Sequence, residues 1–220
     1  YTVYGCTDSI ANNFNQNASL DDSSCIYSFN TTDLLITEIA DPNNSSTAAR
    51  YVELYNASTE DIDLSIGSGY ALARWTNGSA EISSTKELTG TIPAEGFYVV
   101  CNSASKFLAT YGVDASQNIG SGGPADSNGD DIIALLAPDG SVIDIYGQPG
   151  QDGSLNQGGL SEFEDGRAER ACGTSASSTW NVNDWNIDND SGGGDGAQDA
   201  PGAFDPFEWG CLTSSTSGCT

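Results

Sequence analysis

Short runs of β-branched and aromatic residues, separated by turn-forming residues at regular intervals, limit most strongly how this chain can fold. Leu34–Ile39 and Tyr51–Tyr55 are the clearest runs, and Pro93–Gly96 and Pro138–Gly140 are typical β-turns, since proline presets φ and glycine supplies a positive φ. The sequence therefore predicts an all-β fold, with a β-sandwich over residues 33–147. Further strands are predicted at Ile62–Leu64, Tyr70–Trp75, Ala80–Ser83, Phe97–Cys101, Asp131–Leu136 and Val142–Tyr146.

One short helix is predicted over Ser103–Gly112. Ser103 is a typical N-cap residue, and Gly112 is a typical helix stop. Phe107, Leu108 and Tyr111 would lie on one face. Because the segment allows only about two turns, we expect it to plug one end of the sandwich.

Four segments follow from the changes in composition. Residues 1–28 form a short unit bracketed by two cysteines, and residues 29–32 are a predicted linker. The sandwich with its extension covers residues 33–210, where the part over 148–210 is rich in Gly, Asp and Trp. Residues 211–220 form a cysteine-containing tail.

The six cysteines favour disulfide bonds formed in an oxidising compartment. A zinc site is the alternative, but the chain has no His and no CxxC pair. A disulfide between the first two cysteines would stabilise a unit that is too small for its own core. Among the remaining four cysteines, a bond from Cys172 to Cys211 or to Cys219 is an open alternative. The pairing that we favour joins Cys6 to Cys25, Cys101 to Cys172, and Cys211 to Cys219. A chain without a start Met or signal sequence is what a processed secreted protein would show.

The charge balance is extreme, with 31 acidic residues against six basic ones and a formal net charge of −25. Such a surface repels phosphates and anionic lipids, so we expect no nucleic-acid partner. The absence of 18 consecutive apolar residues predicts no membrane span. Two interpretations of the acidity remain, namely solubility in salty surroundings and binding of divalent cations.

Calcium is the cofactor that the acidic clusters could bind, since it prefers flexible sites of six to eight oxygen ligands. Three clusters have suitable residues, but none completes an EF-hand loop, and each could instead be a solvated polar turn. In the best of the three, residues with oxygen ligands stand at alternating positions. The residues of the best cluster are Asn186, Asp188, Asp190 and Asp195. Two weaker clusters comprise Asn13, Asn15, Asn17, Asp21 and Asp22, and Asp126, Asn128, Asp130 and Asp131.

Catalysis is not expected. Without His, a Ser-His-Asp or Cys-His arrangement is impossible. Carboxylates abound, yet no spacing singles out a glycosidase pair, and Gly120–Gly123 lacks the following helix that a phosphate-binding loop needs. The sequence therefore predicts a protein that is not an enzyme.

Two glutamates and several tail residues have alternative roles. Glu38 and Glu53 lie within apolar strands, where they could contact a partner or metal, or pair internally with backbone or with an arginine such as Arg50, Arg74 or Arg170. Arg167 and Arg170 are expected to hold the extension over residues 148–210 to the sandwich. The aromatic residues of the extension, here called the tail aromatics, could pin the extension to the sandwich or form a platform on which a glycan stacks. They are Trp180, Trp185, Trp209, Phe204 and Phe207.

Seven positions match the N-glycosylation acceptor pattern, which predicts a glycosylated surface if the source is a eukaryote. They are Asn17, Asn30, Asn43, Asn44, Asn56, Asn77 and Asn189.

Several of these motifs, in order, resemble the lamin tail domain family. The resemblance rests on the strand that contains Glu38, the Tyr51–Asn56 strand, and the Ile62–Ser65 step, and it continues through Thr91–Val100, Lys106–Gly112, Asn128–Leu136 and Val142–Gly147. Glu164–Arg170, Trp180–Trp185 and Phe204–Trp209 are similar to the extension of secreted microbial members. The resemblance implies an immunoglobulin-like sandwich used for binding or assembly, with no catalytic residues of its own.

The amino-terminal unit has a resemblance of its own. Gly5–Asp8, Asn13–Ala18 and Asp21–Cys25 are similar to a short GCTD…DDGSC module of marine secreted proteins, in which Gly usually stands at the position of Ser23. We therefore expect a non-catalytic extracellular structural or adhesion module, with protein partners or self-assembly into a homo-oligomer. The alternative is an accessory substrate- or glycan-binding domain of a secreted hydrolase, or a calcium-dependent lectin.

Overall fold

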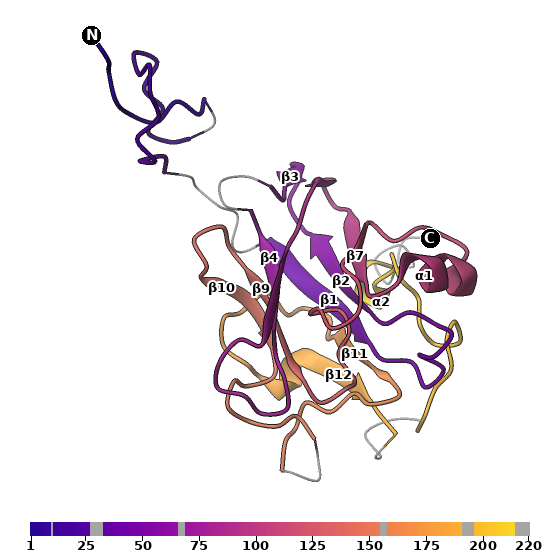
Figure 1. Ribbon diagram of the computed structural model, residues 1–220. Coiled ribbons are helices and arrows are strands. Elements are labelled where there is room, and N and C mark those ends of the chain that lie inside the picture. Colours follow the sequence, from indigo (N-terminus) through magenta and orange to yellow (C-terminus); the bar gives the residue numbers. More distant parts are fainter. Residues whose placement is uncertain (10, 27–32, 66–68, 155–157, 191–195, 214–220) are drawn as a thin grey trace.

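The computed structural model describes residues 1–9, 11–26, 33–65, 69–154, 158–190 and 196–213, and its main body is a two-layer β-sandwich (Figure 1). The larger sheet contains, in spatial order, β12 (Trp185–Asp188), β11 (Arg167–Arg170), β1 (Leu34–Ala40), β2 (Tyr51–Asn56), β7 (Phe97–Cys101) and β8 (Gln117–Asn118). The smaller sheet contains β10 (Val142–Tyr146), β9 (Ile132–Leu136), β4 (Ala71–Trp75) and β5 (Ser84–Glu87). The short pair is β3 (Ile62–Asp63) and β6 (Thr91–Ile92). The predicted all-β sandwich is confirmed.

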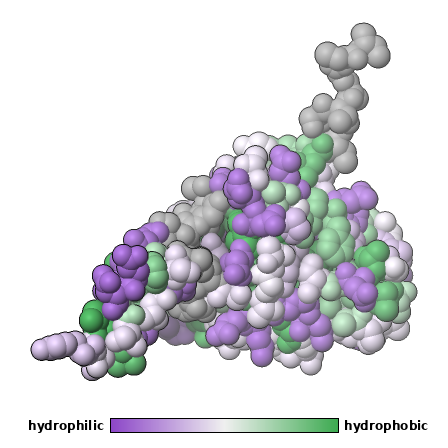
Figure 2. Space-filling view, turned by 90° about the horizontal axis from the view of Figure 1, so that it is seen from above, coloured by the Kyte–Doolittle hydropathy of each residue, from purple (hydrophilic) through white to green (hydrophobic). Residues whose placement is uncertain are grey.

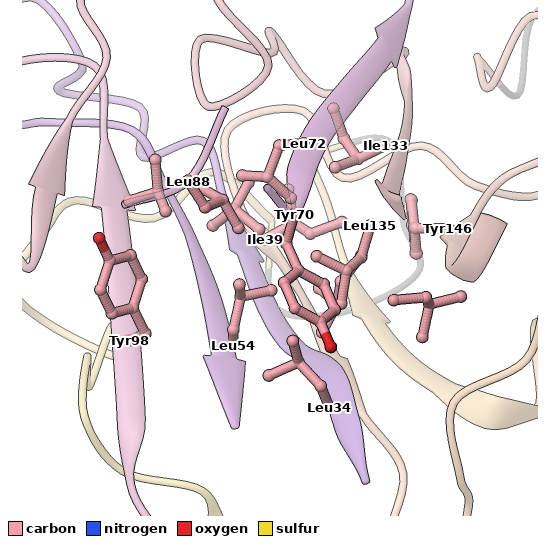
Figure 3. Close-up of a cluster of buried hydrophobic side chains, with 14 of the residues drawn as sticks. Leu34, Ile39, Leu54, Tyr70, Leu72, Leu88, Tyr98, Ile133, Leu135 and Tyr146 are labelled. Atoms are coloured by element: carbon pink, nitrogen blue, oxygen red, sulfur yellow. The ribbon is translucent and has the colours of Figure 1, made fainter. Parts of the chain in front are cut away.

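The core lies between the two sheets and follows from strand alternation. Leu34 and Leu54 from the larger sheet meet Leu72 and Leu135 from the smaller one (Figure 3). All four are fully buried, and the rings of Tyr70 and Tyr146 belong to the same cluster. Each such side chain contributes roughly 1.5–3 kcal/mol on burial.

A β-bulge changes the alternation within β1. The register with β2 shifts between Ile36 and Glu38, so that Ile36 and Ile39 both belong to the core. Without the bulge, side chains would keep alternating along β1, and Glu38 would point into the core as Ile36 does. The bulge instead places Glu38 on the outer face of the larger sheet, beside Tyr51.

The helix α1 (Ala104–Tyr111) lies against that outer face. Phe107 is fully buried against Tyr51 and Val99, and the helix ends at Gly112, whose φ of 75° allows its N–H to donate to the Leu108 carbonyl. The predicted helix is confirmed, but the expectation that it plugs one end of the sandwich is wrong. Its apolar face matches the outward-facing residues of β2 and β7, which would otherwise be exposed.

The carboxy-terminal extension supplies two strands rather than only docking on the sandwich. β11 pairs with β1, where Glu38 lies opposite Glu169, and β12 pairs with β11. The sandwich therefore does not end at residue 147. The extension also contains a 3-10 turn, Val182–Asp184, and the short helix α2 (Gly210–Thr213) begins at its last residue.

One predicted strand is misplaced. The strand expected over Ala80–Ser83 lies instead at Ser84–Glu87. Ile82 suggested the earlier position, but its side chain is exposed, and a turn with positive φ at Asn77 and Gly78 occupies the preceding residues. An edge strand with polar side chains carries no hydrophobic alternation that would reveal it.

The amino-terminal unit is closed by the predicted Cys6–Cys25 disulfide. A single parallel bridge joins Tyr4 to Leu20, and Ser23 adopts the positive φ of 61° that glycine would favour. In Figure 1 this unit projects from the sandwich at the amino-terminal end of the chain.

The remaining cysteines differ from the expectation. Cys172 pairs with Cys211, with their Cα atoms 5.2 Å apart, and Cys101 is a free, buried thiol. The favoured Cys101–Cys172 pairing is therefore wrong. Cys101 ends β7, and three inter-strand steps separate β7 from β11, or about 14 Å, which exceeds disulfide reach. Cys219 lies outside the described residues. Its predicted bond to Cys211 is nevertheless wrong, because Cys211 is already paired with Cys172.

Candidate functional site

The two motif glutamates lie side by side on the outer face of the larger sheet. Glu38 and Glu53 are register partners on β1 and β2, and both are buried. Glu38 accepts a hydrogen bond of 2.6 Å from the Tyr51 hydroxyl and one of 3.3 Å from the Arg167 guanidinium. Glu53 accepts one of 2.8 Å from the Thr37 hydroxyl.

Burial makes this carboxylate pair weakly acidic. Burial raises the pKa of Glu38 to about 7, although the Arg167 charge opposes the shift. Burial and the neighbouring Glu38 charge raise the pKa of Glu53 well above its usual value. The pair would resemble a general acid–base couple if it were open to solvent.

The segment that follows residue 203 covers the pair. The backbone N–H of Phe207 donates to Glu53 at 2.5 Å, and Arg167 bridges Glu38 to Asp205. Phe207 adopts a φ of 72°, a conformation that is rare for a bulky residue. The internal role predicted for both glutamates is thus the correct one, but the pairing arginine is Arg167 and not Arg50, Arg74 or Arg170.

Arg170 connects the two sheets inside the sandwich. It forms an ion pair with Asp144 of β10, and both side chains are 1% exposed. Its Nε donates to the Ile36 carbonyl at 2.6 Å, and its guanidinium carbon lies 4.4 Å from the centre of the Trp185 ring. The extension is therefore attached to the sandwich through both Arg167 and Arg170, as expected.

The best predicted calcium cluster does not form a loop. Asn186 and Asp188 lie on β12, where they pair with Glu169 and Arg167. Asp190 is exposed, and Asp195 lies outside the described residues. No group of three or more acidic or cysteine side chains in the described residues could hold a metal ion. Calcium at this cluster stays a prediction.

The two weaker clusters are partly used by local hydrogen bonds. In the amino-terminal unit, the Asn13 side chain binds the backbone of Ser24 and Ile26. In the other cluster, Asp126 accepts from Arg50 and Asn102. These side chains stabilise turns.

Asp130 and Glu162 behave differently from those acidic residues. The Oδ1 atom of Asp130 and the Oε2 atom of Glu162 are buried without a hydrogen-bond partner. Burial and the charges of Asp131 and Asp152 raise the pKa of Asp130 to about 6. Sequence reasoning named Asp130 only within a weak cluster and missed Glu162, because no local pattern links two residues that lie 32 positions apart.

Burial divides the glycosylation candidates. Asn56 is fully buried and donates to the Glu60 and Pro93 carbonyls, and Asn189 is buried and donates to the Glu162 carbonyl. These two are wrong as acceptors, since a glycan needs an accessible amide nitrogen. The half-buried Asn44 binds Ala200, whereas the exposed candidates are Asn17, Asn43 and Asn77. Asn30 lies outside the described residues.

The tail aromatics separate into buried and accessible groups. Trp185, Trp209 and Phe204 are buried, as pinning residues would be, and Phe207 packs beside α1. Trp180 is half-exposed and packs edge-on against Tyr146, with ring centroids 4.9 Å apart.

Trp180 forms a wall shared by two surface hollows of about 300 Å³ each. One hollow is also lined by Gln151, Asp152 and Asn181, and both by Gln148. Neither the indole N–H of Trp180 nor the side-chain amides of Gln148 and Gln151 form hydrogen bonds within the described part of the chain. Trp180 therefore lies beside polar side chains that have no hydrogen-bond partner in the described residues.

The fold and these sites define a class of protein: an immunoglobulin-like β-sandwich whose two buried motif glutamates, Glu38 and Glu53, are hydrogen-bonded within the chain. Residues 28–150 match the family model described as Lamin Tail Domain, which is more than half of the chain, and the chain therefore belongs to the lamin tail domain family. This family is a non-enzymatic, immunoglobulin-like fold. A search of curated proteins found no match. Among the described residues, no helix has the length and apolar character needed to cross a membrane.

Proposed function

We propose that the protein is a non-catalytic extracellular adhesion module that makes its contacts through the amino-terminal unit. Two disulfides support an oxidising compartment. The absence of catalysis is supported by the family and by the covering of Glu38 and Glu53, which leaves this acid pair without room for a substrate.

The observation that carries the proposal is the exposed apolar surface of the first 26 residues. Six of the eleven exposed large hydrophobic side chains in the described residues belong to this unit, which buries only Cys6 and Ala11 as its own core. Figure 2 shows hydrophobic residues at the surface of the projecting part. We expect these six side chains, which share one small unit, to form a contact surface, since contiguous exposed apolar patches mark interaction sites. The six are Tyr1, Val3, Tyr4, Phe14, Leu20 and Ile26.

The partner that we propose is a second copy of the chain. A net charge of −25 repels copies from one another at low salt. Because the Debye length falls from about 10 Å at 0.1 M to about 3 Å at 1 M salt, apolar contacts would prevail at high ionic strength. Self-association should therefore strengthen with salt.

Sedimentation velocity over a concentration series, at about 0.1 M and about 1 M salt, tests this. We expect a larger mean species at high salt and concentration, and a loss of that species in Tyr4→Ser/Leu20→Ser. Ile82→Ser is the matched control, since Ile82 is equally exposed but lies on the sandwich. A monomer under every condition, or equal effects of both variants, would overturn the proposal.

A second candidate is glycan binding at Trp180, favoured by the two hollows that this ring separates. Aromatic faces stack on sugar rings, and the free amides of Gln148 and Gln151 could bind hydroxyl groups. The acidic surface favours neutral polysaccharides over acidic ones. Affinity electrophoresis should show retardation on a neutral polysaccharide that Trp180→Ala abolishes and Trp180→Phe keeps. Equal mobility of all three proteins on every polysaccharide would rule this candidate out.

A further inference from the structure

Asp130 and Glu162, which take no part in the motif-glutamate pair, each have one buried carboxylate oxygen without a hydrogen-bond partner. Glu162 is 2% exposed, and its Oε2 atom has no hydrogen-bond partner. The Oδ1 atom of Asp130 is likewise buried without a partner. Neither residue forms an ion pair in the described part of the chain. Burial of an ionised carboxylate is unfavourable unless a donor or a cation balances it.

Backbone contacts bring the segments that carry these two carboxylates together, and the Glu162 charge acts on Asp130. The N–H of Phe163 donates to the Gly129 carbonyl at 2.8 Å, which places Asp130 beside Glu162 on adjacent chain segments. The N–H of Gly153 donates to the Asp130 carbonyl at 3.1 Å, which brings a third segment, with Asp152, to the same place.

Glycines allow this close approach of three segments. Gly129 has a φ of 97°, and a Cβ there would lie 2.3 Å from the Cα of Glu164. A Cβ on Gly153 would lie 2.8 Å from the Asp130 carbonyl oxygen. Such contacts are closer than side chains tolerate, so both positions require glycine.

Arg74, the basic side chain that pairs with the neighbouring Asp131, directs its terminal nitrogens to groups other than Asp130 and Glu162, and its buried Nε has no hydrogen-bond partner. Arg74 lies 3.4 Å from Asp131 and donates to the carbonyls of Asp126 and Gly122. No other basic residue forms an ion pair with the acidic side chains of these three segments in the described residues. The local charge is therefore strongly negative.

We propose that a calcium ion binds between Asp130 and Glu162, with their unpartnered carboxylate oxygens as ligands and Asp152 at the rim. All available donors are oxygens, and irregular loops suit the flexible coordination of calcium better than the strict octahedron of magnesium. Because no three acidic side chains converge in the described residues, backbone carbonyls and water complete the shell. This site is separate from the Asn186–Asp195 cluster and does not depend on the proposed adhesive function.

Isothermal titration of the full chain with calcium, at constant ionic strength after removal of divalent ions, tests the site. We expect one calcium per chain, a higher melting temperature with calcium, and at least tenfold weaker binding by both Glu162→Gln and Asp130→Asn. Asp114→Asn is the matched control, since Asp114 is exposed and forms no interaction among the described residues. Far-UV circular dichroism checks that each variant folds.

Three results would overturn the proposal. No binding of calcium is the first, and magnesium binding with equal or greater affinity is the second. Loss of binding in Asp188→Asn but not in Glu162→Gln would place the ion at the β12 cluster instead. If Glu162 is simply protonated, Glu162→Gln will change the melting temperature equally with and without calcium, and wild-type protein will show no calcium response.

Discussion

The guanidinium of Arg170 lies in the centre of the sandwich against the carboxylate of Asp144, so that one residue of the extension joins the two sheets. Asp144 also accepts from the backbone N–H groups of Ile36 and Ser177. Strands β1, β10 and β11 thus meet at one buried ion pair.

Replacing Arg170 with Met should reduce the free energy of unfolding by about 3–5 kcal/mol, because Asp144 would remain buried without its cation. Urea denaturation measures this change. Arg170→Met/Asp144→Leu should regain part of the loss, since no charge is left unpaired. Lys86→Met, on the exposed edge strand β5, is the control and should change stability by less than about 0.5 kcal/mol. A loss below about 1 kcal/mol in Arg170→Met would contradict the structural role of the pair.

Stability should fall as pH rises through the range in which Glu38 titrates. Its pKa is about 7 in the folded protein, against 4.5 for the ordinary group, so the folded state holds a proton that the unfolded state releases. The free energy of unfolding should therefore decrease between these pH values, by at most roughly 3 kcal/mol. Asp41, with a pKa raised by burial to about 6, acts in the same direction.

Urea denaturation at several pH values between 4.5 and about 7, the ordinary and the folded-state pKa of Glu38, measures this slope. Glu38→Gln should make the profile flatter, because the group no longer titrates. A stability that rises with pH over the same range in wild-type protein would show that Glu38 is ionised throughout.

The Cys172–Cys211 bond should hold the covering segment in place. Cys211→Ser should lower the free energy of unfolding by about 4 kcal/mol, from the loop entropy of a bond with a sequence separation of 39. Alkylation of denatured, unreduced protein should label Cys101, and peptide mapping should recover Cys172 joined to Cys211. A recovered Cys101–Cys172 peptide would refute the assignment.

A chain cut at residue 150, where the family match ends, should not unfold cooperatively. It lacks β11 and β12, and with them Ala168, Arg170 and Trp185, all of which are buried in the sandwich. Differential scanning calorimetry should show no sharp transition for residues 28–150 and a sharp one for residues 28–213. Equal transitions in both would mean that the extension is not part of the folding unit.

The elements that the sequence predicted well are those whose signals are local. Alternating apolar residues identified β1, β2 and β7, and the Ser103–Gly112 pattern located α1. The spacing of Cys6 and Cys25 within a small unit was sufficient to predict their bond. Each of these features depends on residues that lie close together along the chain.

The features that the sequence did not reveal depend on contacts between distant segments. β11 has the sequence Arg-Ala-Glu-Arg, and its inward residues include a charged one, so hydrophobicity could not identify it as a strand. The choice of Arg167 as the partner of Glu38 follows from the β1–β11 register, and the approach of the segments that carry Asp130 and Glu162 follows from the backbone hydrogen bond between Phe163 and Gly129. The free Cys101 could be recognised only after the strand order was known.

Sheet order also dictates when this protein can fold. The strand β1 lies near the start of the chain, yet its pairing with β11 joins Glu38 to Glu169. A ribosome or a secretion channel that releases the chain from its amino terminus must deliver most of it before β1 has both neighbours. Folding with such distant partners is slow, and a chain that stays unfolded during delivery remains able to pass through a narrow pore.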